Sequence, residues 1–229
     1  MKKYAVITGG TKGIGLALVD KFIAEGYHVI TCARNQNDLD SLVKEHKGFL
    51  KVFKANLENK EEVLNFAKFV KNTTKKVHVI VNNAGLFLPG KIMEEPEENF
   101  EKQMSLNLNA VYYLTKSLNE ILIDHDSFIA NICSTASFMA YENGGSYSIS
   151  KFAVLGLTKV LREELKERGV AVSAVMPGAT YTNSWEGTEL PEERFMKASD
   201  VANAVWLGFT SRKSAVLEEI ILRPVLGDL

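Results

Sequence analysis

Short runs of consecutive apolar residues alternate along this chain with longer segments in which apolar residues recur every three or four positions. Uninterrupted apolar runs are typical of strands that are covered on both faces of a parallel sheet. The recurring positions, such as Ile14, Leu18 and Phe22, indicate amphipathic helices. The predicted strands are Tyr4–Thr8, His28–Cys32, Phe49–Phe53, Val77–Val81, Phe128–Cys133, Val170–Met176 and Glu219–Leu222. The predicted helices are Ile14–Ala24, Asp38–His46, Lys60–Val70, Phe100–Ile123, Ser148–Arg168 and Asp200–Phe209.

This alternation predicts an α/β fold, with a doubly wound parallel sheet of about seven strands and helices on both faces. No linker, internal repeat or low-complexity tract divides the 229 residues, so we expect a single domain over residues 1–229. The weakly periodic segment near 178–197 is expected to form a short lid over a substrate. Ligands of open parallel sheets bind beyond the carboxyl ends of the strands, so functional residues are expected there.

Composition and charge argue against several classes of partner. Lys and Arg number 27 against 28 Asp and Glu, for a net charge of −1, so no basic excess indicates binding to nucleic acid or to an anionic membrane. No apolar stretch approaches the ~20 residues that a membrane span needs, and we expect a cytoplasmic protein. In that compartment Cys32 and Cys133 are expected to be reduced, buried thiols. The histidines show no metal-ligand spacing, so no metal site is expected.

A glycine-rich turn follows the first predicted strand and opens the first predicted helix. Its glycines, Gly9, Gly13 and Gly15, have the spacing G-x-x-x-G-x-G. Gly9 permits a tight turn, and the other two allow the backbone N–H groups at the helix N-terminus to approach a pyrophosphate. The turn lacks the G-K-[ST] ending of a P-loop, which argues against an ATPase. An ordinary βα turn is the alternative, but its place within a β–α–β unit favours a dinucleotide site and a Rossmann fold.

Charges after the second predicted strand favour NADP(H) over NAD(H). An NAD site places a carboxylate about 20 residues past the glycines, where it accepts a hydrogen bond from the ribose 2′-hydroxyl. The first acid in this region is Asp38, which we expect in the first turn of the next helix. Arg34 and Lys12 instead place two cations where a 2′-phosphate would lie. Two solvated surface cations are the alternative interpretation.

A tyrosine and a lysine four residues apart are the main catalytic candidates. Tyr147 and Lys151 share one face of a predicted helix, and a nearby ammonium is expected to lower the pKa of the phenol toward the range of a general acid or base. Ser134 ends a predicted strand thirteen residues upstream and can donate to a carbonyl oxygen, a role for which Ser137 competes. A surface helix pair is the alternative interpretation of the tyrosine and the lysine. Asn107 is unusual inside a predicted helix, which indicates a specific role.

Together these motifs resemble those of the short-chain dehydrogenase/reductase family, from Tyr4 to about Thr182. They are T-G-x-x-x-G-x-G after the first strand, N-N-A-G at 82–85, Y-x-x-x-K with its upstream serine, and a P-G segment that begins at Pro177. The resemblance implies an NADP(H)-dependent oxidoreductase that transfers a hydride between the nicotinamide and a carbonyl or alcohol carbon. The catalytic residues that it implies are Asn107, which would hold a water of a proton relay, Ser134, Tyr147 and Lys151. The cofactor-binding residues that it implies are Gly9, Thr11, Lys12, Gly13, Ile14, Gly15, Arg34, Asn35, Asn56, Leu57, Asn83, Ala84, Gly85, Tyr147, Lys151, Pro177, Gly178, Thr180 and Thr182.

One position departs from the family pattern. Asn56 stands where the family usually has an Asp that accepts a hydrogen bond from the adenine amino group, and an Asn carbonyl oxygen can still accept that bond. The resemblance further implies a homodimer or homotetramer that pairs the helices at 100–123 and 148–168 between subunits.

The substrate stays open at this point. A carrier-linked 3-oxoacyl compound and a small free ketone, aldehyde or sugar are both compatible with the motifs. A dinucleotide-binding sensor or scaffold without turnover is an alternative from another class, and the filled catalytic positions argue against it. A methyltransferase is a further alternative, which would leave Tyr147 and Lys151 without a role. Apolar candidates for lining the substrate pocket are Leu86, Phe87, Leu88, Phe138, Met139, Tyr141 and Trp185.

Overall fold

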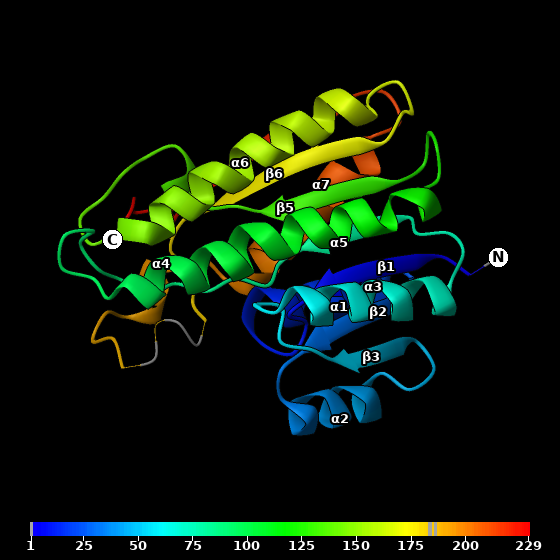
Figure 1. Ribbon diagram of the computed structural model, residues 1–229, viewed down its shortest axis with the longest axis horizontal. Coiled ribbons are helices and arrows are strands. Elements are labelled where there is room, and N and C mark those ends of the chain that lie inside the picture. The colour runs from blue at the N-terminus through cyan, green and yellow to red at the C-terminus, as the bar shows by residue number, and fades with distance from the viewer. Residues whose placement is uncertain (1, 183–184, 186) are drawn as a thin grey trace.

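A seven-stranded parallel sheet forms the centre of the computed structural model, which describes residues 2–182, 185 and 187–229 (Figure 1). The strands lie in the order β3-β2-β1-β4-β5-β6-β7. The direction of winding reverses between β1 and β4, which makes this the switch point where ligands bind in such sheets. The strands are β1 (Tyr4–Thr8), β2 (His28–Ala33), β3 (Leu50–Lys54), β4 (Val79–Asn82), β5 (Phe128–Ile132), β6 (Ala171–Pro177) and β7 (Glu219–Leu222).

Helices cover both faces of the sheet, which confirms the predicted doubly wound α/β domain. The α-helices are α1 (Gly13–Ala24), α2 (Gln36–Glu45), α3 (Lys60–Thr73), α4 (Glu97–Gln103), α5 (Ala110–Leu118), α6 (Gly145–Leu165) and α7 (Ala198–Ser211). Phe66 of α3, Leu114 of α5 and Leu165 of α6 belong to the core on one face, and Leu18 of α1 and Val205 of α7 belong to the core on the other. In Figure 1, α5 and α6 lie in front of the sheet and α7 lies behind it. No helix among the described residues is both long and apolar enough to cross a membrane.

The inner strands are mostly apolar because helices cover them on both sides. Every residue of β5 and β6 is buried, whereas the edge strands β3 and β7 are partly exposed. Each fully buried Val, Leu, Ile or Phe side chain stabilises the fold by about 1.5–3 kcal/mol relative to its exposure. All seven predicted strands are present. The largest difference is at β4, where Val77 makes only an isolated bridge to Leu122 and the strand begins at Val79.

The prediction of one regular helix over 100–123 is wrong. The structure has α4, then a π-helical segment over Met104–Asn109, then α5, and a final 3₁₀ turn over Asn119–Ile121. A π-helical turn carries an extra residue in the helical repeat and is found often at functional sites. Here the segment contains Asn107, whose buried side chain accepts a hydrogen bond from the backbone N–H of Leu86, outside the helix.

A buried polar network ties two helices to the middle of the sheet. Asn82 Nδ2 donates to Thr115 Oγ1 of α5 at 3.1 Å and to Asn131 Oδ1 of β5 at 2.7 Å. Asn131 Nδ2 in turn donates to Thr158 Oγ1 of α6 at 2.8 Å. All four side chains are buried, and buried polar groups cost free energy unless they are hydrogen-bonded. The network therefore sets the position of α5 and α6 relative to the strand ends.

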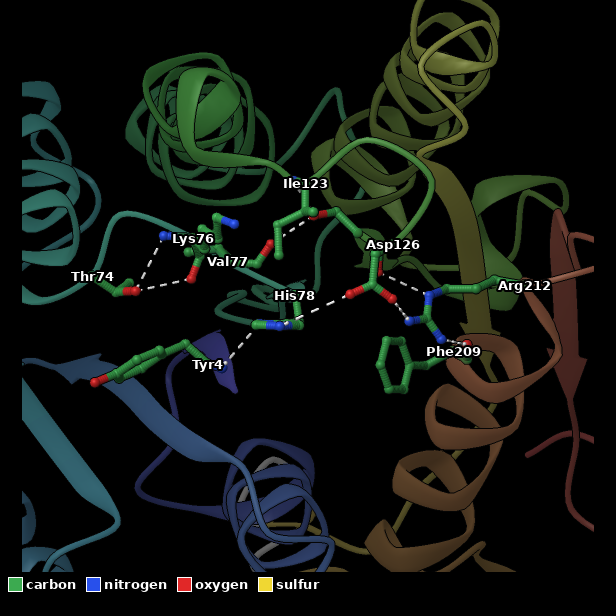
Figure 2. Close-up of polar contacts among 10 residues, drawn as sticks. Tyr4, Thr74, Lys76, Val77, His78, Ile123, Asp126, Phe209 and Arg212 are labelled. Carbon is green, nitrogen blue, oxygen red and sulfur yellow. Dashed lines mark hydrogen bonds and ion pairs between the residues drawn. The ribbon is translucent and has the colours of Figure 1, made fainter. Parts of the chain in front are cut away.

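A second polar group lies at the amino edge of the sheet, opposite the strand ends that carry the predicted motifs (Figure 2). His78 Nδ1 accepts a hydrogen bond from the backbone N–H of Tyr4 at 3.2 Å, and its Nε2 lies 3.9 Å from Asp126 Oδ2. The Asp126 carboxylate also pairs with Arg212 at 2.5 Å. Burial lowers the pKa of His78, and Asp126 offsets this lowering only in part. The cations that add to the lowering are Lys3, Arg212 and Lys76.

We expect the stability of the protein to fall as the pH drops below 6.5, the ordinary pKa of a histidine, in part through His78. Because the folded state holds the pKa of His78 below that value, the unfolded chain takes up the proton first as the pH falls. His78→Asn keeps an acceptor for the Tyr4 N–H and does not titrate. Between about pH 7 and pH 5, its free energy of unfolding in urea should fall less than that of the wild type, by up to about 1.4 kcal/mol per pH unit.

The matched control is His125→Asn, because His125 is exposed and has a left-handed backbone conformation (φ 59°) that asparagine tolerates. This control should keep the wild-type pH dependence. Equal losses of stability in the wild type and in His78→Asn would contradict the assignment.

Candidate active site

Two turns meet at the switch point of the sheet, one after β1 and the other after β4. The Thr8 hydroxyl accepts hydrogen bonds from the backbone N–H groups of Asn83 and Ala84, both at 2.9 Å, and Asn83 Nδ2 donates back to Thr8 O at 2.8 Å. A Cβ atom on Gly15 would lie 2.0 Å from Gly9 O, so only glycine fits where the two turns meet α1. The junction thus has backbone on all sides and little room for side chains.

The N-terminus of α1 opens onto this junction and suits an anion. Within the described chain, Lys12 at the N-cap makes no side-chain cap, and the first turn of α1 contains no acidic residue. The first N–H groups of the helix therefore stay free for a bound group. A Cβ atom on Gly13 would lie 3.0 Å from Thr182 Cγ2, so Thr182 packs closely over the turn. These features fit the pyrophosphate of a dinucleotide.

A cleft runs from the junction along the carboxyl ends of the strands. It consists of two hollows of about 490 and 410 Å³, which share Ile14, Asn83, Gly85 and Thr182 in their walls. Predicted residues in the wall of the first hollow are Gly9, Thr11, Lys12, Gly13, Gly15, Arg34, Asn35, Asn56, Leu57 and Ala84. Those in the wall of the second are Ser134, Tyr147, Lys151, Pro177, Gly178 and Thr180. The structure thus brings every predicted cofactor-binding residue to this one cleft.

The two cations expected to meet a 2′-phosphate are both paired with carboxylates. Arg34 Nη1 lies 3.3 Å from Glu58 Oε1, and Lys12 Nζ lies 3.2 Å from Asp38 Oδ2. Asp38 occupies the first turn of α2, as predicted, and also lines the first hollow. No sequence motif indicates these counter-charges. They offset much of the positive charge at this end of the cleft, so a phosphate there must compete with them.

Two asparagines at the same end hold the local backbone. Asn35 caps α2, since its Oδ1 accepts from the N–H groups of Asn37 at 2.9 Å and Asp38 at 3.4 Å. This cap explains why α2 begins at Gln36, two residues before the predicted start. Asn56 Oδ1 accepts from the backbone N–H of Glu58 at 3.2 Å. An amide oxygen has two acceptor lone pairs, so Asn56 can still accept one bond from an adenine amino group.

Tyr147 and Lys151 lie in the first two turns of α6 and project into the second hollow. Lys151 Nζ is 5.7 Å from the centre of the Tyr147 ring. The ammonium donates a hydrogen bond to the carbonyl oxygen of Ile132, the last residue of β5, at 2.8 Å. The strand end therefore anchors the lysine beside the tyrosine.

Ser134, and not Ser137, faces the phenol. The Ser134 side chain lies close enough to Tyr147 to lower the pKa of the phenol, and Ser134 lines the second hollow. Ser137 is fully buried, and its Oγ accepts from the backbone N–H of Ser134 at 3.2 Å. Ser137 thus holds the turn that presents Ser134. Of the two serines that the sequence offers, only Ser134 therefore lines the described wall of the second hollow.

Burial controls the protonation of the candidate catalytic groups. It raises the pKa of Tyr147 above the ordinary value, and the nearby Ser134 side chain offsets this only in part. It lowers the pKa of Lys151. The pKa of the phenol is raised, opposite in direction to the lowering expected from Lys151, because desolvation by burial is the largest influence and the Lys151 ammonium is bonded to Ile132 O. The phenol is protonated at neutral pH and is a proton donor.

Cys133 borders the same hollow without the properties of a nucleophile. Burial raises the pKa of its thiol, so the thiolate is disfavoured. Cys32 and Cys133 are both free and buried, as the sequence predicts.

Asn107 connects the π-helical segment to the N-N-A-G turn. Its Oδ1 accepts from the backbone N–H of Leu86 at 2.8 Å, and its Nδ2 donates to Leu86 O at 3.0 Å. A Cβ atom on Gly85 would lie 3.4 Å from Asn107 Oδ1 and 3.6 Å from Lys151 Nζ, so these two polar atoms flank the same point of the turn. Asn109, the neighbouring asparagine, is exposed.

Ser150 is a residue of this site that the sequence analysis missed. Asn107 Nδ2 donates to Ser150 Oγ at 2.9 Å, and Ser150 Oγ donates to the carbonyl oxygen of Tyr147 at 2.7 Å. The hydroxyl therefore links Asn107 to the first turn of the helix that carries Tyr147. Its position three residues after Tyr147, on the same helix face, is the signal that the sequence contains.

The apolar part of the second hollow matches the sequence expectation in part. Of the seven apolar candidates, Leu86, Phe87, Met139, Tyr141 and Trp185 line it. Leu88 and Phe138 are not in its wall. Residues 183, 184 and 186 of the expected lid lie outside the described residues. The wall also contains Asp228 and Leu229, which no sequence motif indicates.

Comparison with known proteins agrees with this geometry. A family model described as short chain dehydrogenase matches residues 3–193, which is most of the chain. The chain belongs to the short-chain dehydrogenase/reductase family.

Relatives of this dehydrogenase/reductase match it over nearly its whole length. An uncharacterised oxidoreductase of Staphylococcus epidermidis is 28% identical over 225 residues, which cover 98% of both chains. Among solved structures, a metagenomic short-chain oxidoreductase in complex with NADP has 27% identity and a TM-score of 0.84, with 97% of each chain covered. A blue fluorescent protein from a metagenomic library, in complex with NADPH, has 25% identity and a TM-score of 0.89, covering 97% of this chain and 96% of that one.

We expect Asn107→Ala to destabilise this dehydrogenase/reductase by about 1–3 kcal/mol, because it leaves the buried polar groups of Leu86 without partners. The free energy of unfolding in urea measures this loss. The matched control is Asn109→Ala, from the exposed side of the same segment, which should change stability by less than about 0.5 kcal/mol. Similar values for the two variants would show that the contacts of Asn107 carry no stability.

Proposed function

We propose that this short-chain dehydrogenase/reductase reduces the carbonyl group of a small ketone or aldehyde with NADPH. The observation that carries the proposal is that Ser134 lies beside a protonated Tyr147 in the second hollow. This hollow adjoins the first one, which the glycine-rich turn and the N-terminus of α1 border. The apolar residues in the wall of the second hollow suit an uncharged organic substrate; they are Leu86, Phe87, Met139, Tyr141 and Trp185.

In the proposed reaction, the cleft residues from Gly9 to Thr182 would hold a nicotinamide dinucleotide, which would supply the hydride for the carbonyl carbon. The hydroxyls of Ser134 and Tyr147 donate hydrogen bonds to the carbonyl oxygen, where negative charge develops. Tyr147 then transfers its phenolic proton to that oxygen, and the product is the alcohol. Lys151, anchored on Ile132 O beside Tyr147, would hold the nicotinamide ribose. Asn107 holds the adjoining N-N-A-G turn and would anchor a water molecule that returns a proton to Tyr147.

The raised pKa of Tyr147 favours reduction over alcohol oxidation at neutral pH. Reduction needs the protonated phenol, which is present below its pKa, whereas oxidation needs the phenolate, which forms only as the pH rises through it. The proposed preference for NADP(H) favours reduction as the usual direction.

We expect Tyr147→Phe to lower the turnover of a carbonyl substrate by at least about a hundredfold, because it removes the proton donor. Affinity for NADPH, measured by quenching of protein fluorescence, should stay close to that of the wild type. Tyr181→Phe, which removes a phenol outside the described wall of the second hollow, is the control and should retain its rate. Wild-type turnover in Tyr147→Phe would refute the role of the phenol.

A panel of carbonyl compounds tests the reaction class itself. Tight binding of NADPH by the wild type without oxidation of NADPH by any compound would favour a sensor or scaffold. Activity limited to carrier-linked 3-oxoacyl compounds would replace the small free carbonyl by that substrate class.

The preference for NADPH over NADH rests on Arg34 and Lys12 at the open end of the first hollow. Solved relatives that hold NADP or NADPH support the same cofactor. In the free protein the carboxylates of Glu58 and Asp38 form ion pairs with these cations. The preference for NADPH therefore depends on how well its 2′-phosphate competes with the two carboxylates for Arg34 and Lys12.

We expect Arg34→Ala to raise the dissociation constant for NADPH by at least about tenfold and to leave that for NADH nearly unchanged, since a hydrogen bond to a charged group contributes about 1.5–3 kcal/mol. Glu58→Gln removes the competing charge and should tighten NADPH binding severalfold. Fluorescence titration with each nucleotide measures both constants. An unchanged ratio in Arg34→Ala would exclude this arginine from cofactor selection.

We further propose a homo-oligomer that pairs α5 and α6 with their copies. Tyr112 of α5 and Ile149, Phe152 and Val160 of α6 are exposed apolar side chains, and a Cβ atom on Gly156 would meet no described atom within 4 Å. An apolar face with a small residue at its centre allows close approach of a second helix. Sedimentation velocity should show a dimer or tetramer for the wild type and a shift toward monomer for Phe152→Glu. A monomeric wild type would contradict the proposal.

A further inference from the structure

The last residues of the chain return to the site from the far edge of the sheet. After β7, the backbone N–H of Gly227 donates to Pro224 O at 2.9 Å, which closes a turn with Val225 and Leu226 exposed at its tip. The reversal brings residues 228 and 229 into the wall of the second hollow. We call residues 224–229 the closing segment.

Arg223 ties this segment to the rest of the pocket. Its Nε donates to Asp228 Oδ1 at 3.1 Å, and its Nη2 pairs with Asp228 Oδ2. The same Nη2 donates to Met139 Sδ at 3.3 Å, and Met139 lines the hollow. Arg194 Nη2 adds a bond to Asp228 O at 3.4 Å. One guanidinium thus joins the closing segment to the loop that follows Ser134.

The proline–glycine segment lies against the same structure. Gly178 N–H donates to Leu222 O at 2.8 Å, and a Cβ atom on Gly178 would lie 3.3 Å from Pro224 Cδ and 3.5 Å from Asp228 Oδ1. The closing segment is therefore packed on the backbone that borders the hollow. A shift of this segment changes the size of the hollow directly.

We propose that the closing segment is the specificity wall of the substrate pocket, latched by the Arg223–Asp228 ion pair. It favours compact carbonyl compounds over bulky ones. The inference rests on the proposed function and names the substrate class of that same site. Leu229 lines the hollow together with Asp228, whose carboxylate is paired with Arg223, so the segment fills space that a bulky substrate would need.

The latch is weak enough to be adjustable. The side chains of Arg223 and Asp228 are 44% and 37% exposed, and ion pairs at such exposure contribute little and are screened by salt. A bulky carbonyl compound can therefore displace the segment at a modest cost. Discrimination between compact and bulky substrates should be correspondingly modest and should weaken in high salt.

The test compares kcat/KM for 2-acetonaphthone, a bulky neutral ketone, with that for 2-butanone, a compact one. Arg223→Gln releases the latch and should raise the ratio of bulky to compact about two- to fivefold, the range of a single exposed ion pair. Arg223→Asp should do the same by repelling Asp228. The charge-reversed double variant, Arg223→Asp with Asp228→Arg, should restore the wild-type ratio. Val225→Ser, at the exposed tip of the turn, is the control and should leave the ratio unchanged.

A binding measurement keeps the inference separate from the proposed function. Nile red, a bulky neutral carbonyl dye, should bind Arg223→Gln about two- to fivefold more tightly than the wild type in the presence of NADP⁺, and the double variant should reverse the change. If the wild type reduces neither ketone, the proposed function fails, and the dye still decides the role of the wall. An unchanged dye affinity and an unchanged ketone ratio in Arg223→Gln overturn the inference.

Discussion

The Thr8 hydroxyl accepts two backbone N–H groups of the N-N-A-G turn, and the rest of the site depends on this junction. It holds the turn after β1 against the turn after β4 at the point where the winding of the sheet reverses. Gly15 lets α1 approach the same point, so a free helix N-terminus faces the cleft. One hydroxyl and one absent side chain thereby place the free N-terminus of α1 at the cleft whose other wall carries Tyr147.

Burial supplies the chemistry as well as the stability of the wall. The Asn82–Asn131 network fixes α6 to the sheet, and Asn107 with Ser150 fixes the first turn of that helix to the N-N-A-G turn. The same burial raises the pKa of Tyr147, so the phenol keeps the proton that a reduction consumes. A protonation state that the sequence attributes to a neighbouring charge is thus controlled mainly by desolvation.

Charge at the rim of the cleft is balanced where the sequence suggests an excess. The Arg34 and Lys12 side chains have carboxylate partners in Glu58, which lies between β3 and α3, and in Asp38 of the first turn of α2. The Arg223–Asp228 pair at the other end of the cleft is similarly exposed. Weak, solvated ion pairs at both ends leave the cleft able to exchange these partners for ligands.

The sequence by itself determined the α/β class, the strands and the motif residues. Periodicity and glycine spacing are local properties, and parallel strands bring their carboxyl ends to one edge whatever the details of packing. Only the tertiary structure showed the π-helical turn at Asn107, the role of Ser150, the counter-charges of Arg34 and Lys12, and the return of Leu229 to the pocket. These features depend on contacts between segments far apart in the chain. Such contacts leave no periodic trace, because hydrogen bonds and desolvation act through distances in space.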